Sequence, residues 1–238
     1  RKSLPACIGV NLIGWGKMKF SVVYKPTALF SLRDSNSTNS GAKSLFLPSP
    51  YAVKMAFLSQ AISLGGIDFE NNPRLFEIVR DVKISYFVKG SFCVNNCFVK
   101  IQKQRDNDPF RPTVSFREYV FLSDDIEIIF ETDTEKGVAF LKTYLHCINY
   151  FGKRGCFFQF VAYKEIPSEP NVKVFDPHDW SAGIMQEYDD FDQSLTFEKV
   201  NSYSEAKTRR NKQILVLPLV CYSASKSYTR YVCNGNSH

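Results

Sequence analysis

The rest of the chain is organised around residues 19–66, which read KFSVVYKPTALFSLRD, SNSTNSGAKS and LFLPSPYAVKMAFLSQAISLGG. In the first segment, Phe20, Val22 and Tyr24 alternate with residues of the opposite face, and β-branched and aromatic types dominate. This pattern predicts a strand that buries one face. Pro26 has no N–H for a ladder, so it ends the strand or places it at a sheet edge.

A helix is predicted to begin at Pro50. Ser49 is a typical N-cap residue, and a proline at the first helical position loses nothing by lacking an N–H. Gly65 and Gly66 are expected to end the helix, because glycine favours the backbone conformation found at helix C-termini. The apolar face of this helix is expected to contain Val53, Phe57 and Ile62.

A polar, glycine-bearing loop is predicted between these two elements, at residues 35–44. It is flanked by the basic residues Lys25, Arg33 and Lys43. Long loops between regular elements are usually either functional or disordered. The sequence leaves both readings open, a functional loop and an ordinary surface loop.

The composition predicts one globular core. The chain has 238 residues, of which 44% are hydrophobic and 23% charged. Its 21 Phe and 12 Tyr residues favour β-rich packing and surfaces on which bases could stack. No run approaches eighteen apolar residues, and proline and glycine break the N-terminal stretch, so a membrane span and a signal peptide are not expected. We therefore expect a cytoplasmic protein.

The cysteines argue against a disulfide framework and against a zinc site. There are seven, an odd number, and no CxxC spacing repeats. Buried, reduced thiols are the expected explanation. No metal and no cofactor is expected.

Charge is distributed unevenly along the chain, although the net charge is a modest +6. Residues 167–198 are acidic, and residues 199–230 are basic. The asymmetry suggests one face for a polyanion and another for a protein partner. The alternative is that both stretches are solvated loops.

A long basic hairpin is predicted in the middle of the chain. Two β-rich arms, Cys93–Ile101 and Val114–Leu122, are joined by the polar stretch QKQRDNDPFRP. Such a hairpin suits a single-stranded nucleic acid, because cations follow phosphates while aromatic faces stack bases. Many proteins carry basic hairpins without this ligand, so an ordinary surface hairpin remains the alternative. The residues concerned are Lys100, Lys103, Arg105, Arg111 and Arg117, with the aromatic residues Phe98, Phe110 and Phe116.

A second strand–helix–strand unit follows the hairpin. A strand is predicted at 126–132, helix-start chemistry at 133–135, and a helix up to Phe151. A turn with glycines on both sides of Lys153 and Arg154 then leads into a strand at Cys156. Two such cations could meet phosphate, or they could simply cap the helix. Pro218 interrupts a last strand and favours an edge or a bulge there.

The predicted order is strand, helix, strand, hairpin insertion, strand, helix, strand. Without the insertion this approximates the split β-α-β, ferredoxin-like arrangement of RNA-recognition domains, with helices on one face of the sheet. The predicted fold class is therefore α+β, ferredoxin-like (RRM-like), with a long β-hairpin insertion. A β-rich extension, acidic and then basic, occupies the C-terminus.

Four features together resemble the RAMP superfamily of CRISPR-associated proteins. They are the strand with YKPTALFSLRD, the polar loop, the LPSPYAVKMAFL helix start and the INYFGKRGCFFQF glycine turn. Within the superfamily the chain resembles the Cas-five group, which caps the 5′ handle of crRNA in Cascade-type effectors. The resemblance covers residues 19–165, implied to be an RRM-like RAMP domain with a hairpin thumb at about 92–122. Residues 166–238, the C-terminal extension, have no counterpart in it.

The resemblance implies a subunit of an antiviral ribonucleoprotein rather than a free enzyme. Its implied partners are the crRNA 5′ handle and other effector subunits, especially the backbone RAMP subunit and a large subunit, with target DNA or RNA reached indirectly and no membrane. It implies RNA contacts at Tyr24, Lys25, Thr27, Ser31, Arg33, Lys54, Lys100, Lys103, Arg105, Arg111, Arg117, Lys153 and Arg154.

Some relatives instead cut pre-crRNA, so metal-independent cleavage must be weighed. The reaction needs a base for the 2′-OH proton and cations for the developing charge. His146 lies in an apolar helical pattern, His178 in an acidic stretch, and His238 at the end of the sequence. None belongs to the first helix or to the loop before it.

The sequence therefore predicts no catalytic residue. Tyr24 with Lys25 or Lys54 could replace the histidine, which keeps an endoribonuclease open as an alternative. A metal nuclease is disfavoured, because the acidic run near Asp190 has no second carboxylate cluster on a regular element. A third alternative is an adaptor that binds only protein.

Overall fold

The computed structural model describes residues 17–34, 41–104, 109–179, 181–200 and 210–234. None of the helices in these ranges is both long and apolar enough to cross a membrane. In chain order, the elements are β1 (Met18–Pro26), β2 (Leu32–Arg33), β3 (Gly41–Ala42), β4 (Ser44–Leu45), α1 (Pro50–Gly65), α2 (Pro73–Asp81), β5 (Lys83–Phe87), β6 (Ser91–Lys103), β7 (Arg111–Leu122), β8 (Ile126–Thr132), α3 (Glu135–Leu145), β9 (Phe158–Lys164), β10 (Lys173–Val174), β11 (Ile184–Phe191), α4 (Phe197–Val200), β12 (Arg210–Leu217), β13 (Leu219–Ala224) and β14 (Tyr228–Cys233).

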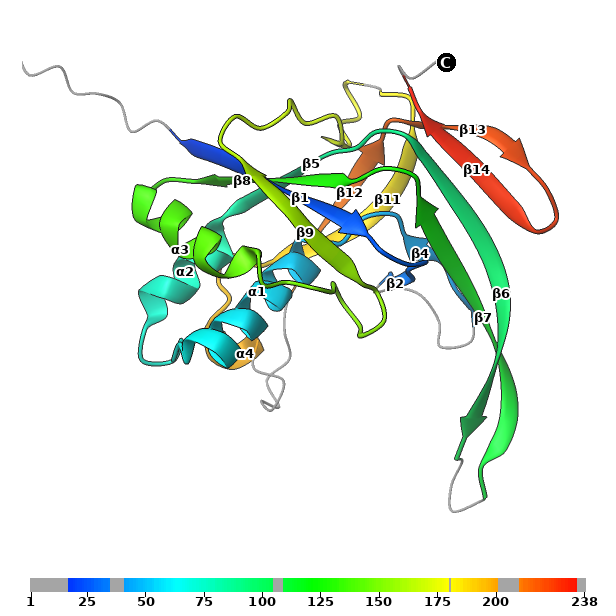
Figure 1. Ribbon diagram of the computed structural model, residues 1–238, viewed down its shortest axis with the longest axis horizontal. Helices are drawn as coiled ribbons and strands as arrows, with labels where there is room; N and C mark the ends of the chain where they lie inside the picture. The colour runs from blue at the N-terminus through cyan, green and yellow to red at the C-terminus, as the bar shows by residue number, and fades with distance from the viewer. Residues whose placement is uncertain (1–16, 35–40, 105–108, 180, 201–209, 235–238) are drawn as a thin grey trace, which may run out of the picture.

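A four-stranded antiparallel sheet forms the centre, in the order β5-β8-β1-β9. Its central strand β1 buries Phe20, Val22 and Tyr24, as the alternation predicted. Tyr24 pairs in register with Ile126 of β8 and Phe160 of β9. Helices α1 and α2 connect β1 to β5, and α3 connects β8 to β9. In Figure 1 the helices gather on one side, and the β6–β7 hairpin stands out from the other.

Helix α1 begins and ends where the sequence predicted. The Ser49 hydroxyl oxygen accepts a 3.1 Å hydrogen bond from the N–H of Ala52, and Pro50 occupies the first turn. Gly66 ends the helix with a left-handed φ of 60°. The predicted apolar face is confirmed except at Ile62, which is 43% exposed although its neighbour Ala61 is buried.

Helix α3 begins as predicted but ends six residues early, at Leu145 rather than Phe151. Thr134 caps its start by accepting a hydrogen bond from the N–H of Gly137. At its end, the N–H groups of Cys147 and Ile148 bond three residues back, which tightens the last turn. The chain then turns, and Phe151 is buried in the core beyond the end of the helix.

A second, five-stranded sheet contains the hairpin, in the order β13-β14-β6-β7-β3. The predicted hairpin is confirmed as a pair of strands, β6 and β7. Part of the loop predicted at 35–44 is regular, because Gly41 and Ala42 pair in parallel with β7; residues 35–40 lie outside the described ranges. The strand predicted to continue through Pro218 is instead two strands, but the edge predicted there is confirmed, because β13 is an edge strand. Pro218 separates β12 from β13, which belong to different sheets.

The expected separation of acidic and basic faces is also wrong for the described residues. The acidic strand β11 lies antiparallel to the basic strand β12. Lys212 Nζ lies 2.7 Å from Glu187 Oε1, and Arg210 Nη1 lies 2.8 Å from Asp189 Oδ2. Opposite charges that are far apart in sequence therefore neutralise one another across a ladder.

One hydrophobic core runs from Phe20 of β1 to Cys233 of β14, so the C-terminal extension shares the core of the central sheet. The six cysteines that the structure describes are free. Cys156 and Cys233 are buried as expected, but Cys221 is exposed because it lies on the edge strand β13. Cys7 lies outside the described residues.

Candidate nucleic-acid interface

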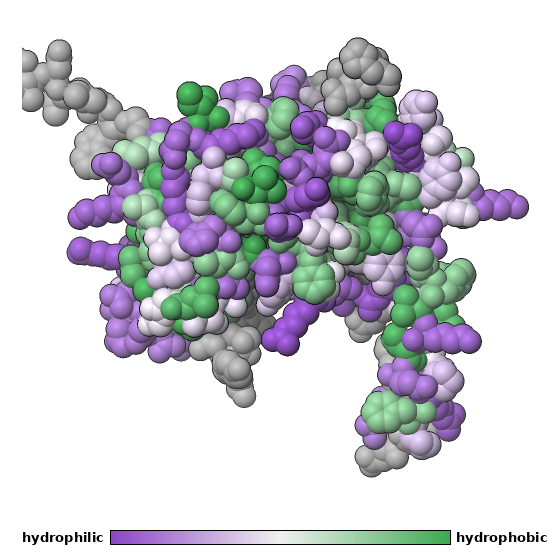
Figure 2. Space-filling model, viewed as in Figure 1, coloured by the Kyte–Doolittle hydropathy of each residue, from purple (hydrophilic) through white to green (hydrophobic). Residues whose placement is uncertain are grey.

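The hairpin of β6 and β7 projects from the body of the protein. Its register runs unbroken from Phe92 opposite Leu122 to Lys103 opposite Arg111. Phe92 and Leu122 are buried at the base, whereas Phe98 is 72% exposed farther out. Figure 2 shows the stem clear of the body, with hydrophobic and hydrophilic side chains mixed along it. A long two-stranded ribbon of this kind can reach a ligand that the body does not touch.

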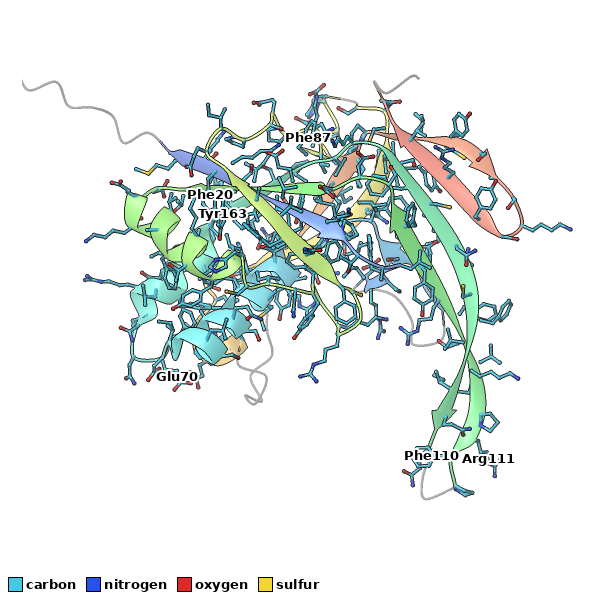
Figure 3. The ribbon with its side chains drawn as sticks, viewed as in Figure 1. Phe20, Glu70, Phe87, Phe110, Arg111 and Tyr163 are labelled. Atoms are coloured by element: carbon cyan, nitrogen blue, oxygen red, sulfur yellow. The ribbon has the colours of Figure 1, made fainter. Side chains whose placement is uncertain are left out.

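The two faces of the hairpin stem carry different side chains. Phe98 and Phe116 pair across the strands with ring centroids 4.5 Å apart, and Lys100 follows two residues later on the same face. Arg117 opposes Cys97 on the other face. Phe110 and Arg111 lie at the far end (Figure 3). Arg105, a predicted contact, lies outside the described residues.

The glycine turn is a closed loop that presents two cations. Gly152 and Gly155 have φ values of 68° and 101°, which side-chain-bearing residues rarely adopt. The Phe151 N–H donates to the Cys156 carbonyl across the turn, and the Cys156 N–H donates to the Lys153 carbonyl. Lys153 and its neighbour Arg154 are both exposed. The backbone therefore fixes the base of the loop and leaves both cations in solvent.

The segment after β1 connects this turn to the hairpin. The N–H of Thr27 donates to the carbonyl of Phe157, 3.2 Å away, and Phe30 exchanges two backbone hydrogen bonds with Val120 at the hairpin base. The Cys156 thiol lies 3.4 Å from the carbonyl oxygen of Ser31. Thr27, the glycine turn and the base of the hairpin are thereby held in one structural unit.

Exposed cations surround this unit. Lys25, Lys43, Lys100, Lys153 and Arg154 make no ion pair with any residue in the described ranges. Arg33, on β2, is exposed as well. The positive charge of Lys25, Lys43, Lys100, Lys153 and Arg154 raises the local concentration of a polyanion and speeds its association.

Three predicted contacts need correction, because their side chains are buried. Tyr24, Ser31 and Lys54 are 0%, 4% and 2% exposed. The Tyr24 hydroxyl donates a 2.6 Å hydrogen bond to the carbonyl of Leu145, and burial raises the pKa of Tyr24 well above its ordinary value. These three side chains belong to the protein interior and are not accessible to RNA.

Lys54 has a clear structural role inside α1. Its ammonium lies 2.7 Å from Asp190 Oδ1 of β11 and donates to the carbonyl of Arg80, at the end of α2, over 2.8 Å. It also lies over the ring of Phe191, 5.5 Å from the centroid. Burial lowers the pKa of Lys54, and the charge of Asp190 opposes that change. The side chain thus joins three elements and does not reach solvent.

The sheet face opposite the helices is closed near Glu127. This carboxylate is 4% exposed and accepts hydrogen bonds from the Lys164 ammonium and the Ser21 hydroxyl, each at 2.6 Å. The N–H and hydroxyl of Ser168 bind it from the segment after β9. Burial alone would raise the pKa of Glu127, but these hydrogen bonds lower it to about 2. RNA-recognition domains stack bases on this face of the sheet. Because the face is closed in this protein, a nucleic acid would have to bind to another surface.

Two exposed residues lie beside the turn: Phe157 was missed from the sequence, and His146 was weighed there only as a base for cleavage and set aside. His146 and Phe157 line an open hollow of about 420 Å³ together with Thr27. Nδ1 of His146 lies 3.1 Å from the carbonyl of Lys142, and Phe157 is 49% exposed. The apolar helical pattern concealed His146, because it assumed a helix that continued past Leu145.

No group of three or more His, Cys, Asp or Glu side chains is placed to hold a metal ion within the ranges that the structure describes. His238 lies outside these ranges. His178 is exposed in the segment before β11.

Comparison with known proteins gives one substantial sequence match. No protein-family model matches the chain. The chain is 26% identical over 196 residues to a protein named CRISPR-associated protein Cas5 from Archaeoglobus fulgidus, and the match covers 77% of this chain and 84% of that protein.

Two solved structures resemble the chain more distantly. A structure titled as a CRISPR protein from Archaeoglobus fulgidus has 12% identity over 92% of each chain and a TM-score of 0.45. A chain from a CRISPR RNA-guided surveillance complex has 10% identity over 90% of each chain and a TM-score of 0.41. TM-scores this low do not establish a shared fold. The sequence match spans most of both chains, so this protein is similar in sequence to the CRISPR-associated protein Cas5.

Proposed function

We propose that the protein is a non-catalytic subunit of a CRISPR effector ribonucleoprotein that binds and caps the 5′ handle of crRNA. The observation that carries the proposal is the junction of the glycine turn, Thr27 and the base of the hairpin, with exposed cations around it. A single-stranded RNA end needs cations for its phosphates and aromatic faces for its bases. Lys153 and Arg154 supply the first, and Phe157 and Phe98 the second.

We further propose that residues 19–165 form a ferredoxin-like RAMP domain, with the hairpin as its thumb and residues 166–238 as an extension. The support is the strand order β5-β8-β1-β9 with two crossover connections through helices, which is the split β-α-β pattern. The extension contributes β14 to the hairpin sheet. It would stiffen the base from which the thumb projects.

The proposed neighbours are other effector subunits, chiefly the backbone RAMP subunit and a large subunit. Apolar side chains along the stem support a protein contact, since Phe116 and Val114 are 50% and 48% exposed. Exposed apolar side chains on a projecting element are typical of an interaction site. Target DNA or RNA would be reached through the crRNA.

The proposal is tested by measuring the affinity for single-stranded RNA that ends in a CRISPR-repeat 5′ handle, with duplex DNA as the competitor. The double variant Lys153→Glu, Arg154→Glu should lose about tenfold or more in affinity for the handle RNA, because each phosphate contact contributes to binding and to its salt dependence. Its matched control is Arg74→Glu, Lys136→Glu, which reverses two exposed cations on α2 and α3. Equal binding of handle RNA and duplex DNA by the wild type would overturn the proposal.

Cleavage of pre-crRNA is the alternative, and burial argues against two of its candidate residues. Tyr24 and Lys54 are inaccessible, so neither can take a proton from a bound 2′-OH. His146 is the exposed candidate near the turn. We expect full-length repeat RNA to stay intact with excess protein, with or without divalent metal. Cleavage at the handle that His146→Ala abolishes would replace the capping function with a nuclease.

A further inference from the structure

The five-stranded sheet has an outer face that points away from the core. In the ladder, Cys93 of β6 lies between Phe121 of β7 and Arg230 of β14, and Asn95 lies between Tyr119 and Tyr228. Side chains at such positions share one face, because they are opposite one another in the register. The alternate residues of β6, such as Phe92 and Val94, are buried in the core. We call this surface, which includes Tyr222, the outer face.

Aromatic rings are exposed on the outer face. Phe121 is 51% exposed, Tyr228 43% and Tyr222 67%. The guanidinium of Arg230 lies 5.1 Å from the centroid of the Tyr222 ring, which places Tyr222 on the same side of the sheet as Arg230. Phe121 of β7 lies on one side of β6, and Arg230 and Tyr228 of β14 lie on the other, so rings and a cation flank the small β6 side chains on this face.

The charge on this face has a single sign. Arg117 and Arg230 are its cations, and Arg111 follows on the same side of β7 toward the tip. The strands β6, β13 and β14 contain no Asp or Glu, and the one carboxylate of β7, Glu118, belongs to the opposite face. Glu118 there accepts a 2.7 Å hydrogen bond from the N–H of Ser44. A surface with rings, cations and no carboxylate complements a polyanion that can stack.

We propose that the outer face binds a stretch of single-stranded RNA that continues from the hairpin across β7, β6, β14 and β13. Bases stack on Phe121, Tyr228 and Tyr222, and phosphates contact Arg117 and Arg230. Charge complementarity and the continuity of this face with the hairpin stem select RNA as the occupant. The inference rests on the proposed function, which supplies the single-stranded RNA. It goes further because it assigns RNA contacts to the C-terminal extension, far in sequence from the glycine turn.

The test compares matched variants of the full chain by fluorescence anisotropy with unstructured, end-labelled RNAs of two lengths, one about as long as the hairpin site and one that reaches the outer face. Tyr222→Ala, Tyr228→Ala should weaken binding of the longer RNA about tenfold to a hundredfold, since stacked bases contribute strongly. It should leave the shorter RNA unaffected. Arg230→Glu should act in the same direction. The controls are Leu64→Ala, which removes an exposed apolar side chain from α1, and Arg74→Glu, and both should bind as the wild type does.

A second measurement keeps the inference testable if a variant unfolds. Wild-type protein is photo-crosslinked to the longer RNA carrying 4-thiouridine, and the modified peptides are identified by mass spectrometry. Adducts at Phe121, Tyr222 or Tyr228 support the inference. Adducts confined to the glycine turn and the hairpin tip overturn it.

The outcomes separate this inference from the proposed function. If the outer-face variants bind the longer RNA normally while Lys153→Glu, Arg154→Glu is weakened, the inference fails and the capping function stands. If only the outer-face variants are weakened, the capping function fails and the outer face stands. If the outer-face variants lose as much affinity for single-stranded DNA of the same sequence, the face is not specific for RNA. If a protein binds this face in place of RNA, the assignment of RNA as the ligand is wrong.

Discussion

Two antiparallel strand pairs in this protein carry cations, and they use them in opposite ways. In β11–β12, each cation meets a carboxylate on the neighbouring strand, as Lys212 does with Glu187. In β6–β7, the register places Lys100 opposite Val114 and Lys103 opposite Arg111. The first pair neutralises its charge internally. The second carries the exposed Lys100 opposite an apolar residue and beside the ring of Phe98, and for this reason we propose RNA as its ligand.

The comparison shows that charge content alone does not identify a binding surface. Residues 199–230 are more consistently basic than the hairpin. Even so, Arg210 and Lys212 of β12 form ion pairs with Asp189 and Glu187 of β11. What distinguishes the two regions is the cross-strand partner, which the register of the ladder sets.

The largest effect is expected where a cation is both paired and buried. Lys54→Met removes the partner of Asp190 on β11 and leaves the carbonyl of Arg80 without its donor. Because the loss of one member of a buried pair leaves an uncompensated charge, unfolding should become easier by about 3 kcal/mol or more. Urea denaturation of both proteins measures the difference.

The double variant Lys54→Met, Asp190→Leu is the control for this result. It replaces both charges by apolar groups, which should recover much of the lost stability. A single variant as stable as the wild type would mean that the pair of Lys54 and Asp190 contributes nothing to stability.

The next largest effect on stability concerns Glu127 of the central sheet. Its carboxylate, like those of β11, is bound by a cation on another strand of the same sheet. Its pKa is lowered to about 2 from 4.5. A carboxyl group with a depressed folded-state pKa stabilises the protein above its unfolded-state pKa, and that stability is lost as pH falls through the folded-state value. The contribution is at most about 3 kcal/mol.

Glu127→Gln should therefore be less stable than the wild type at pH 7, and the gap should narrow as pH falls from about 5 to 2. Thermal melts of both proteins across that range measure it. A gap that stays constant with pH would show that the carboxylate is not held in its charged form by Lys164, Ser21 and Ser168.

The smallest effect on folding, and the most direct test of the comparison, reverses two cations in each strand pair. Lys100→Glu, Lys103→Glu should reduce RNA affinity about tenfold and lower the salt slope by about one to two, with little change in melting temperature, because loop and stem charges contribute little to stability. Arg210→Glu, Lys212→Glu should leave RNA binding unchanged but cost about 1 kcal/mol of stability, because like charges then face each other. RNA affinity and melting temperature are measured on both double variants and on the wild type. Equal loss of RNA binding in both variants would end the distinction between the two regions.

Local chemistry in the sequence predicted much of the central sheet. The alternation of Phe20, Val22 and Tyr24, the cap at Ser49 and the cap at Thr134 each depend on neighbours a few residues away, so the sequence contains them directly. The arms of the hairpin were predictable for the same reason. The end of α3 was not, because Phe151 leaves the helix to pack in a core assembled from distant residues.

The candidate site was only partly predictable. Lys153, Arg154, Lys25 and Thr27 are placed around one unit, but Lys54 matched a basic pattern and is buried. Whether a lysine on an amphipathic helix meets solvent or a carboxylate depends on which strand packs against that helix. Here the strand is β11, more than a hundred residues away in the sequence.

The sequence by itself determined the alternation in β1, the N-terminal caps of α1 and α3 and the arms of the hairpin, and that the hairpin is basic and aromatic. Only the tertiary structure decided which charges remain unpaired, which sheet face is open, and that β14 joins β6 to form the outer face. The physical reason is range. Capping, alternation and turn chemistry act over a few residues, whereas burial and charge neutralisation depend on partners that the chain brings together only by folding.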